Sequence, residues 1–313
     1  MSVAARSPRR SVHGVLLLDK PVGLSSQDAL WKARRLLRAE KAGHTGTLDP
    51  LASGLLPLCF GAATKFAQVS LEADKAYRAT LKLGVTRVGG DLEGEILRER
   101  PVQVDRAQVE SVLKRHVGEI DQVPPMQSAL KHQGRALYEY ARAGIEIERP
   151  ARRVHIHGIE LIDWLGDEVV IDVSCSKGTY IRTLAEDIGE ALGCGAHLSA
   201  LRRTGSGAFR IEQAISLPAL AALAEPDRDG CLRPVDAMIE DWPLLRLAET
   251  EAARFLSGLR RRVAMEDRPA IRVYGPEPRA FLGSAHIAGG ELIADRLLSP
   301  IEVRSLLTEA AIP

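Results

Sequence analysis

The segment from Lys75 to Leu83 constrains the fold most, because its side chains alternate strictly between apolar and polar. The apolar positions are Tyr77, Ala79, Leu81 and Leu83, and the polar positions between them are Arg78, Thr80 and Lys82. Successive side chains of a strand point to opposite faces of a sheet, so one face of this segment is buried and the other is exposed. Antiparallel sheets commonly pack one face on a core and leave the other in water. The segment therefore predicts a half-buried strand of an antiparallel sheet.

Helical and strand patterns alternate along the rest of the chain. Apolar residues at helical spacing predict helices over about 26–38, 105–117, 136–143, 180–192 and 251–257, and apolar runs predict strands over 15–18, 154–162 and 169–175. Ser25 or Ser26 can cap the first helix, and Gly193 is expected to end the fourth one in a left-handed conformation. The predicted fold class is α+β, with a mixed, mainly antiparallel sheet.

The length of the chain indicates more than one folding unit. It has 313 residues, whereas a single hydrophobic core rarely grows beyond about 250 to 300 residues. The pattern changes near residues 240–243, and Gly275-Pro276, Gly283 and Gly289-Gly290 interrupt the chain beyond them, as turns between short strands do. We predict a disordered tail over residues 1–12, a large domain over 13–240 and a small β-rich domain over 241–313.

The charges of the chain nearly cancel, since 42 Lys and Arg stand against 41 Asp and Glu, for a net charge of +1. Affinity built on neutralising phosphates alone needs a large basic excess, so any binding to nucleic acid must use local patches. Residues 120–153 form such a patch. Its cations are Lys131, Arg135, Arg142, Arg149, Arg152 and Arg153, opposed by Glu139, Glu146 and Glu148. We predict a basic flap that faces RNA; for each cation by itself, a solvated surface charge is the alternative.

Motifs of several common functional classes are missing from the sequence. It contains no GxxxxGK[ST], no GxGxxG after a strand, no HExxH and no nucleophile elbow, which argues against NTPase, dinucleotide-dependent, zincin and hydrolase functions. The four cysteines stand far apart, and His155 and His157 have no third ligand nearby, so we expect no metal site. No apolar run reaches the roughly 18 residues of a membrane span, so we expect no membrane segment.

The most unusual stretch of the sequence runs from residue 43 to residue 54. Gly43 and Gly46 stand among a His and two Thr, which lets the backbone approach a ligand closely. The stretch delivers a single carboxylate, Asp49, immediately before Pro50. Asp before Pro is also a natural helix N-cap with proline at the first helical position, so a helix start is the alternative to a functional carboxylate.

The complete string GHTGTLDPLASGLL over residues 43–56 resembles the catalytic segment of the tRNA pseudouridine synthases that modify the T loop, and is most similar to the bacterial enzymes acting on uridine-55. Six further motifs carry the same resemblance. They are LDKPVGLSS at 18–26, KAY at 75–77, PPMQSALK at 124–131, GRALYEYARAG at 134–144, SKGTYIRTLAEDIG at 176–189 and LSALRRTGSG at 198–207. The C-terminal part resembles, less sharply, an RNA-binding PUA domain.

The resemblance implies a catalytic domain of pseudouridine synthase type over residues 13–240, followed by the PUA-like domain. It implies an isomerase that breaks the N1 to C1′ bond of uridine, turns the base within the site and rejoins it through C5, without a cofactor or a metal. The essential carboxylate would be Asp49. Attack on C1′, attack on C6 and removal of a C2′ proton remain three open roles for it.

The resemblance also implies roles for five other residues. Arg182 would pair with the catalytic carboxylate and keep it ionised in a closed pocket, although from the residues alone it could be a solvent-facing charge in the first turn of a helix. Tyr77 would stack on the target base, with a place in the sheet core as the alternative. Tyr180 and Leu201 would hold the uracil. His44 would pack against the RNA where the flipped base has left the stack, and a proton-transfer role is its rival.

The partner implied is the T stem-loop of tRNA, bound by shape and phosphate contacts with one base flipped out of its stack. The candidate RNA contacts are Lys20, Lys131, Arg135, Arg142, Arg152 and Arg153. We expect a cytoplasmic monomer, with tRNA folding as an accessory activity. An RNA chaperone without catalysis and an RNA N-glycosidase that releases uracil are the rival functions.

Two stretches depart from the pattern that this family shows. Thr86-Arg87-Val88-Gly89-Gly90 stands where relatives usually have Thr-Asp-Thr, and Gln127 stands where they commonly have an aromatic residue. Both lie outside the set of Asp49, Tyr77 and Arg182 in the sequence. We therefore expect them to affect loop contacts and substrate breadth more than the reaction.

Overall fold

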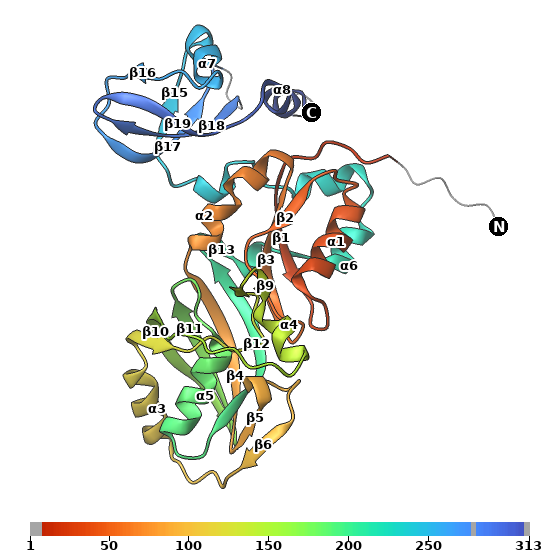
Figure 1. The fold of residues 1–313 in the computed structure, drawn as a ribbon. Helices are drawn as coiled ribbons and strands as arrows, with labels where there is room; N and C mark the ends of the chain where they lie inside the picture. The colour runs from red at the N-terminus through yellow and green to blue at the C-terminus, as the bar shows by residue number, and fades with distance from the viewer. Residues whose placement is uncertain (1–7, 277–279, 310–313) are drawn as a thin grey trace, which may run out of the picture.

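The computed structural model describes residues 8–276 and 280–309, which form two main sheets (Figure 1). The larger one is ten-stranded and consists of β1 (Gly14–Lys20), β2 (Ala42–His44), β3 (Ala52–Phe60), β4 (Lys75–Leu83), β7 (Gly118–Gln122), β10 (Arg152–Leu165), β11 (Glu168–Cys175), β12 (Ala196–Ser206), β13 (Phe209–Arg210) and β14 (Ile215–Ser216). The helices around it are α1 (Ser26–Leu36), α2 (Ala67–Glu72), α3 (Arg106–Arg115), α4 (Leu137–Arg142), α5 (Ile181–Ala191) and α6 (Leu217–Ala222). Short hairpins pair β5 (Val85–Arg87) with β6 (Ile96–Glu99), and β8 (Lys131–His132) with β9 (Arg135–Ala136).

The large sheet runs in the order β14-β1-β3-β12-β4-β11-β10-β7. Along this path β1 pairs in parallel with β14 and β12 pairs in parallel with β3, whereas the other pairs are antiparallel. The predicted α+β class with a mixed, mainly antiparallel sheet is confirmed. The alternating segment that predicted it is β4, a central strand between β12 and β11.

Helices cover the large sheet through two apolar clusters. The inward side chains of β4, Ala79, Leu81 and Leu83, are buried in one cluster with apolar residues of α3 and α5. Leu30 and Ala33 of α1 belong to a second cluster that covers β1 and β3. Ser25 caps α1 by accepting from the Asp28 N–H, as the sequence indicated. Burying this apolar surface, at about 25 cal/mol per Å², stabilises the frame that holds the site.

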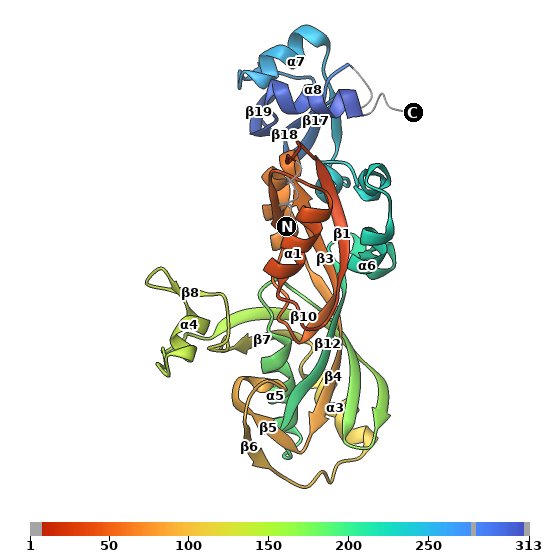
Figure 2. The same ribbon diagram turned by 90° about the vertical axis from the view of Figure 1, so that its right-hand side faces the viewer.

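The segment predicted as a basic flap leaves the sheet and returns to it at adjacent positions. Gln122 at the end of β7 pairs with Arg152 at the start of β10, so the chain between them forms an excursion from one sheet edge. This excursion contains the β8–β9 hairpin and α4, and Figure 2 shows it projecting away from the sheet. The name flap is kept below for residues 120–153.

The second sheet is five-stranded, in the order β15-β17-β18-β19-β16. Its strands are β15 (Leu244–Arg246), β16 (Arg261–Arg262), β17 (Arg268–Tyr274), β18 (Phe281–Ala288) and β19 (Glu291–Leu297), accompanied by α7 (Glu249–Leu256) and α8 (Pro300–Glu309). The sequence predicted the strands and α7 but not α8. This sheet packs on the first one, because Phe66 and Phe281 lie with ring centroids 5.4 Å apart inside one shared cluster.

The tail predicted over residues 1–12 differs from the structure in its second half. Residues 1–7 lie outside the described residues. The Arg10 N–H donates to the Arg38 carbonyl at 2.9 Å, and the Arg10 guanidinium pairs with Asp229. Val12 is buried in the α1 cluster. Long-range contacts therefore order residues 8–12, which no local pattern indicated. In the described part of the chain, no helix is long and apolar enough to span a bilayer.

Candidate active site

The loop between β2 and β3 presents Asp49 at the edge of the large sheet. The Ala52 N–H donates to the Asp49 carbonyl at 3.0 Å, so the chain turns directly into β3. No helix starts here, and the N-cap alternative for Asp49 is wrong. Ser26 of α1 fixes the preceding residue, because its hydroxyl donates to the Leu48 carbonyl at 3.1 Å and accepts from the Leu48 N–H at 2.7 Å. The carboxylate thus stands on a loop anchored to a helix.

Arg182 at the start of α5 is the ion-pair partner of Asp49. Its Nη2 lies 3.0 Å from Asp49 Oδ2. The side chain of Arg182 is 6% exposed and that of Asp49 is 41% exposed, so the pair has a buried cation and an accessible carboxylate. The alternative of a solvent-facing charge for Arg182 is wrong. An arginine so placed can hold the carboxylate beside it in one orientation.

Three further groups surround the Arg182 guanidinium. Nη1 lies 3.4 Å from Asp91 Oδ2, and Asp91 is itself buried. Nη1 also donates to the Gly89 carbonyl at 3.2 Å, and Nη2 donates to the Gln127 carbonyl at 2.7 Å. One guanidinium therefore binds two carboxylates and two main-chain carbonyls. A buried arginine with this many partners has one orientation available to it.

The two stretches that depart from the family pattern meet at this arginine. Gly89 and Gln127 both give their carbonyl to Arg182, and a Cβ on Gly89 would lie 2.9 Å from the Gln127 side-chain oxygen. Both stretches lie outside the set of Asp49, Tyr77 and Arg182 in the sequence, but the fold brings them into contact with Arg182. Sequence separation concealed the contact, because residues 89, 127 and 182 come together only in the folded chain.

Two tyrosines lie near the Asp49 carboxylate. Tyr77 stands on β4 and Tyr180 caps α5, and both are half-buried. Burial raises the pKa of Tyr77, although the charge of Arg203 opposes the increase. Burial also raises the pKa of Tyr180, although the charge of Arg182 opposes the increase. Asp49 adds to the increase in both tyrosines, which reflects how close the three groups are.

His44 and Leu201 occupy the borders of the same region. His44 ends β2, and burial and the charge of Arg203 both lower its pKa, which favours the neutral ring. Its Nδ1 is buried without a hydrogen-bond partner among the described residues. Leu201 on β12 pairs with Ala52 of β3 on one side and Ala79 of β4 on the other. The structure thus brings Leu201 to the strand that follows the Asp49 loop.

Lys20 is not the exposed RNA contact that the sequence suggested. Its exposed fraction is 0%, and its ammonium donates to the Pro21 carbonyl at 3.0 Å and the Leu24 carbonyl at 2.6 Å. Burial lowers the pKa of Lys20 to about 8, partly offset by Asp49. Because the ammonium is enclosed by backbone, we correct this assignment. Lys20 supports the turn after β1, which also holds Pro50 through the Gly23 N–H at 2.8 Å.

The flap cations are exposed, as predicted, but several have partners. Arg135 pairs with Glu139 and lies over the Tyr140 ring, and Arg142 lies over the Tyr138 ring. Arg153 faces Glu119 and Asp121 at 3.7 and 3.5 Å. In the described part of the chain, Lys131 and Arg152 form no ion pair with a carboxylate. These two cations are the ones most available to a phosphate.

Asp91 and Arg203 belong to the site but were not predicted as site residues. Asp91 stands in an acidic turn, where a solvated carboxylate is the ordinary expectation. Arg203 follows Arg202 on β12, and no local signal separates the buried member of this pair from the one that forms a surface ion pair with Asp19. If the register of β12 had been known, a charged residue on its buried face would have marked Arg203 as a candidate site residue.

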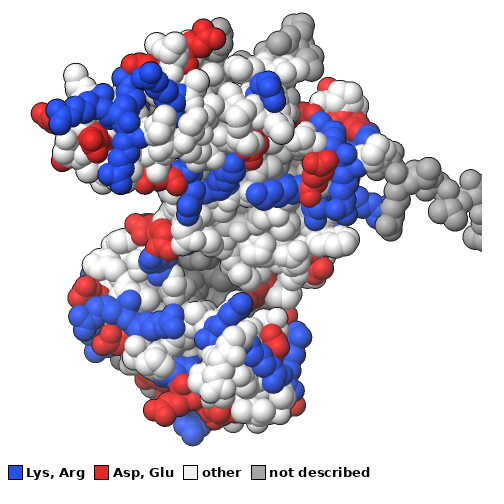
Figure 3. Space-filling view, turned by 45° about the horizontal axis from the view of Figure 1, so that its top comes forward, with Lys and Arg blue, Asp and Glu red and all other residues white. Residues whose placement is uncertain are grey.

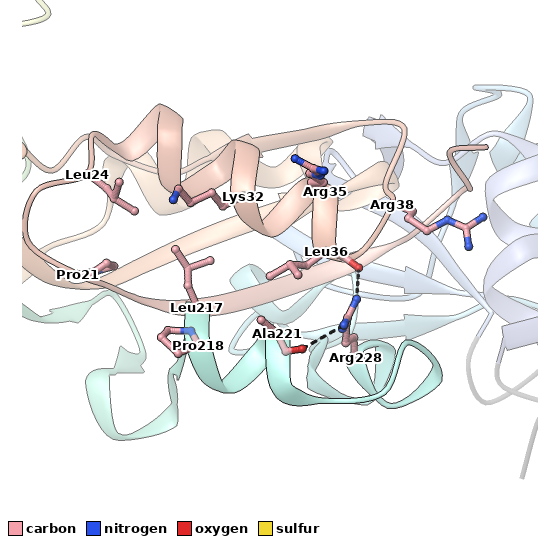
Figure 4. A pocket seen from close by; sticks show the side chains of 10 residues that line it. All are labelled: Pro21, Leu24, Lys32, Arg35, Leu36, Arg38, Leu217, Pro218, Ala221 and Arg228. Carbon is pink, nitrogen blue, oxygen red and sulfur yellow. Dashed lines mark hydrogen bonds between the residues drawn. The ribbon is translucent and has the colours of Figure 1, made fainter. Parts of the chain in front are cut away.

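One cavity of about 490 Å³ borders the site, because Gly89 and Gln127 line it, whereas another lies apart from the site. A groove of about 570 Å³ runs between α1 and α6, with apolar side chains such as Leu24 and Leu217 in it and with Lys32 and Arg35 at its border (Figure 4). None of the predicted substrate-binding residues lines it. Within residues 8–276 and 280–309, no three His, Cys, Asp or Glu side chains gather as a metal site would require. His155 and His157 instead stack against each other, and His157 contacts Asp74.

Known protein families and relatives match most of this chain. The family model described as TruB family pseudouridylate synthase (N terminal domain) matches residues 34–181, and that of the tRNA pseudouridylate synthase B C-terminal domain matches residues 182–240. A tRNA pseudouridine synthase B of Verminephrobacter eiseniae is 57% identical over 309 residues, 96% of this chain and 93% of that protein. A tRNA pseudouridine synthase B of Burkholderia lata is 57% identical over 94% of this chain and 92% of that protein.

Solved structures resemble the whole chain as well. A Cbf5-Nop10-Gar1 complex contains a chain that matches with a TM-score of 0.71 and 27% identity, over 93% of this chain and 86% of that one. An H/ACA RNP bound to a substrate RNA containing 2′-deoxyuridine matches with a TM-score of 0.68 and 25% identity over the same shares. The fold and the site define an isomerase of the pseudouridine synthase class. Within that class, the chain belongs to the TruB family of pseudouridylate synthases.

Proposed function

We propose that this protein converts uridine-55 in the T loop of tRNA to pseudouridine. The observation that carries the proposal is the accessible Asp49 carboxylate held 3.0 Å from a buried Arg182, with two tyrosines beside it. The relatives at 57% identity, which cover nearly the whole chain, are named as tRNA pseudouridine synthases. The substrate assignment rests on them and the chemistry rests on the site.

The proposed reaction needs a carboxylate that is ionised and exposed to one nucleotide. The N1 to C1′ bond of uridine breaks, the base rotates, and C5 bonds to C1′. The C5 proton is then lost to solvent, while N1 ends up protonated, so nothing is oxidised or reduced. Asp49 supplies the essential carboxylate. Arg182 orients it, because its own orientation is fixed by Asp91 and two carbonyls.

The groups around Asp49 suit the binding of a flipped base. Tyr77 offers a ring for stacking, Tyr180 closes the opposite side, and Leu201 contributes strand backbone for hydrogen bonds to the uracil edge. Burial lowers the pKa of His44 and so favours its neutral form, which suits packing against RNA. Base flipping from a loop costs only a few kcal/mol of stacking, which favours a T-loop target over a duplex.

The flap and the C-terminal sheet are proposed to bind the rest of the tRNA. Lys131, Arg135, Arg142, Arg152 and Arg153 lie on the flap or at its base. Figure 3 shows Lys and Arg on both sides of a hollow in one face of the molecule, a distribution that suits phosphate binding. We assign residues 13–240 to the catalytic domain and 241–313 to a PUA-like RNA-binding domain. A monomer acting on cytoplasmic tRNA is the simplest form of this proposal.

The variant Asp49→Asn tests the proposal, because it keeps the shape of the side chain and removes its charge. With tRNA labelled by tritium at uridine C5, the wild type should release tritium and the variant should release none, while both bind tRNA with similar affinity. Mass spectrometry of the product should place pseudouridine at position 55 and nowhere else in the T loop. Turnover at the wild-type rate in Asp49→Asn would contradict the proposal.

The same experiment separates the rival functions. Free uracil in the reaction mixture would identify an N-glycosidase. Accelerated tRNA refolding by both proteins, with pseudouridine formed only by the wild type, would add a folding activity to the isomerase. Refolding without any pseudouridine would make RNA chaperoning the main function.

A further inference from the structure

Arg203 on β12 is a fully buried cation beside the site, with an exposed fraction of 1%. Its Nε donates to the Leu55 carbonyl at 2.7 Å, and its Nη2 donates to the Gly46 carbonyl at 3.4 Å. Within the described residues no carboxylate pairs with it. A buried guanidinium without a counter-ion is costly to keep, because burial disfavours its charge. The contacts of Arg203 must therefore compensate for this cost.

The strand register places Arg203 between the two elements that carry the site. It pairs with Tyr77 across the antiparallel β12–β4 ladder and with Gly54 across the parallel β12–β3 ladder. The backbones approach so closely that a Cβ on Gly54 would lie 2.3 Å from the Arg203 carbonyl oxygen. Position 203 is thus locked to β3 and β4 by its main chain.

The side chain of Arg203 extends this lock to the catalytic loop. Its Nη1 would lie 3.5 Å from a Cβ on Gly46, three residues before Asp49, and its Nη2 faces the Gly46 carbonyl. Gly46 has φ +105°, a conformation that lets its carbonyl point inward to the guanidinium. Arg203 therefore bonds the Asp49 loop through its side chain and pairs with Tyr77 across the β12–β4 ladder.

We propose that Arg203 is a positioning residue for the isomerisation: it fixes the Tyr77 ring relative to the loop that carries Asp49. This inference rests on the proposed function. Several donors in one rigid plane can reach the Leu55 and Gly46 carbonyls together, which the single ammonium of a lysine cannot do. A near-attack geometry depends on such fixed distances, and a displacement of about 1 Å can cost about a hundredfold in rate.

The variant Arg203→Lys tests the inference in the full-length protein. We expect kcat for tritium release to decrease at least tenfold, while the Kd for tRNA changes less than threefold. Arg272→Lys is the control, because Arg272 is a half-buried arginine of the C-terminal sheet that also bonds a main-chain carbonyl, at 3.1 Å from Trp242, and pairs with Asp236. It should lose stability without losing kcat. An Arg203→Lys enzyme with kcat within twofold of the wild type would overturn the inference.

A double-mutant cycle with Tyr77→Phe separates positioning from stability. If Arg203 acts through Tyr77, Arg203→Lys should reduce kcat less in the Tyr77→Phe background, with a coupling of tenfold or more, about 1.4 kcal/mol. Effects that multiply independently would overturn the inference.

The inference can still be tested if Arg203→Lys does not fold. Tyr77→Phe alone should then accelerate amide hydrogen exchange over residues 43–48, and unchanged exchange would overturn the inference. A wild-type protein that forms no pseudouridine would instead contradict the proposed function, whatever the exchange data show.

Discussion

Asp91 Oδ2 lies 3.4 Å from Arg182 Nη1, while Asp49 Oδ2 lies 3.0 Å from Nη2 of the same guanidinium. The two carboxylates differ in their surroundings, since the side chain of Asp91 is 10% exposed and that of Asp49 is 41% exposed. The buried carboxylate balances the buried cation, and the accessible one faces the place where a nucleotide would bind. Asp91 thus orients Arg182, which in turn orients Asp49.

Arg182→Lys and Asp91→Asn should each impair turnover more than tRNA binding. Lysine keeps the charge but cannot bond Asp49, Asp91 and both carbonyls at once, and Asn removes the charge that holds Arg182. We expect kcat to decrease about 10- to 100-fold, because a hydrogen bond to a charged group contributes about 1.5 to 3 kcal/mol and about 1.4 kcal/mol is tenfold in rate. Single-turnover kinetics and filter binding measure the two effects. An unchanged single-turnover rate in Arg182→Lys would show that the reaction does not depend on the guanidinium of Arg182.

Gly54→Ala should destabilise the protein through a backbone clash. The added Cβ would lie 2.3 Å from the Arg203 carbonyl oxygen, and Gly54 has φ +102°. Gly166→Ala is the matched control, since Gly166 also has positive φ but nothing within 4 Å of the added atom. Overpacking costs about 1 to 3 kcal/mol beyond the conformational cost of about 1 kcal/mol that both variants share. Urea denaturation measures the difference, and equal losses would show that the sheet yields at Gly54.

Lys20 should make the stability of the protein depend on pH above 8. Its pKa is about 8 in the folded protein and near 10.5 as an ordinary lysine, so the unfolded chain binds more protons between these values. The free energy of unfolding of the wild type should therefore increase relative to that of Lys20→Met as pH rises from 8 to 10. Denaturation of both proteins at three pH values measures this, with exposed Lys32→Met as the control. A difference that stays constant with pH would mean that the ammonium is hydrated in the folded protein.

The flap cations should contribute unequally to tRNA binding. Lys131→Ala and Arg152→Ala should each weaken binding and reduce the slope of log Kd against log salt by about one, as the loss of one phosphate contact does. Arg153→Ala should have a smaller effect, because Glu119 and Asp121 already face that guanidinium. Binding titrations at salt concentrations from about 50 to 200 mM measure this slope for all three variants. Identical losses for the three variants would contradict the ranking.

Phe281→Ala should destabilise the contact between the two sheets. Phe281 is 3% exposed and packs against Phe66 in the cluster that both sheets share. Truncating a buried phenylalanine costs about 3 to 5 kcal/mol. Leu244→Ala is the control, because Leu244 is 41% exposed on the second sheet. Thermal denaturation followed by circular dichroism compares the two variants, and a loss no larger than that of Leu244→Ala would indicate that the sheets fold independently.

Local patterns predicted much of the secondary structure, but not the central strands β3 and β12. The alternation in 75–83 predicted β4, and helical spacing predicted α1 and α3; α1 begins at the expected cap, Ser25. α8 was missed although Ser299 and Glu302 form a capping box at its start, because its sequence lacks a strong apolar stripe. The basic excursion at 120–153 was recognised from charge, and its return to the sheet edge agrees with that interpretation.

The site could be predicted only as a set of residue types. The motifs identified Asp49, Tyr77 and Arg182 through resemblance to a family, but spacing alone gave each of them a structural alternative. The alternatives for Asp49 and Arg182 failed for a reason that no local pattern contains: the loop turns into β3, and the guanidinium is enclosed by residues 89, 91 and 127.

The sequence by itself determined the elements, the family and the residues that bear charge. The tertiary structure alone decided which charges are buried: Lys20 and Arg203 became internal supports, while Lys131 and Arg152 remained free for a ligand. The physical reason is that helices and strands follow from interactions within a few residues, whereas desolvation and ion pairing depend on the register of β3, β12 and β4. That register brings residues more than a hundred positions apart within hydrogen-bond distance.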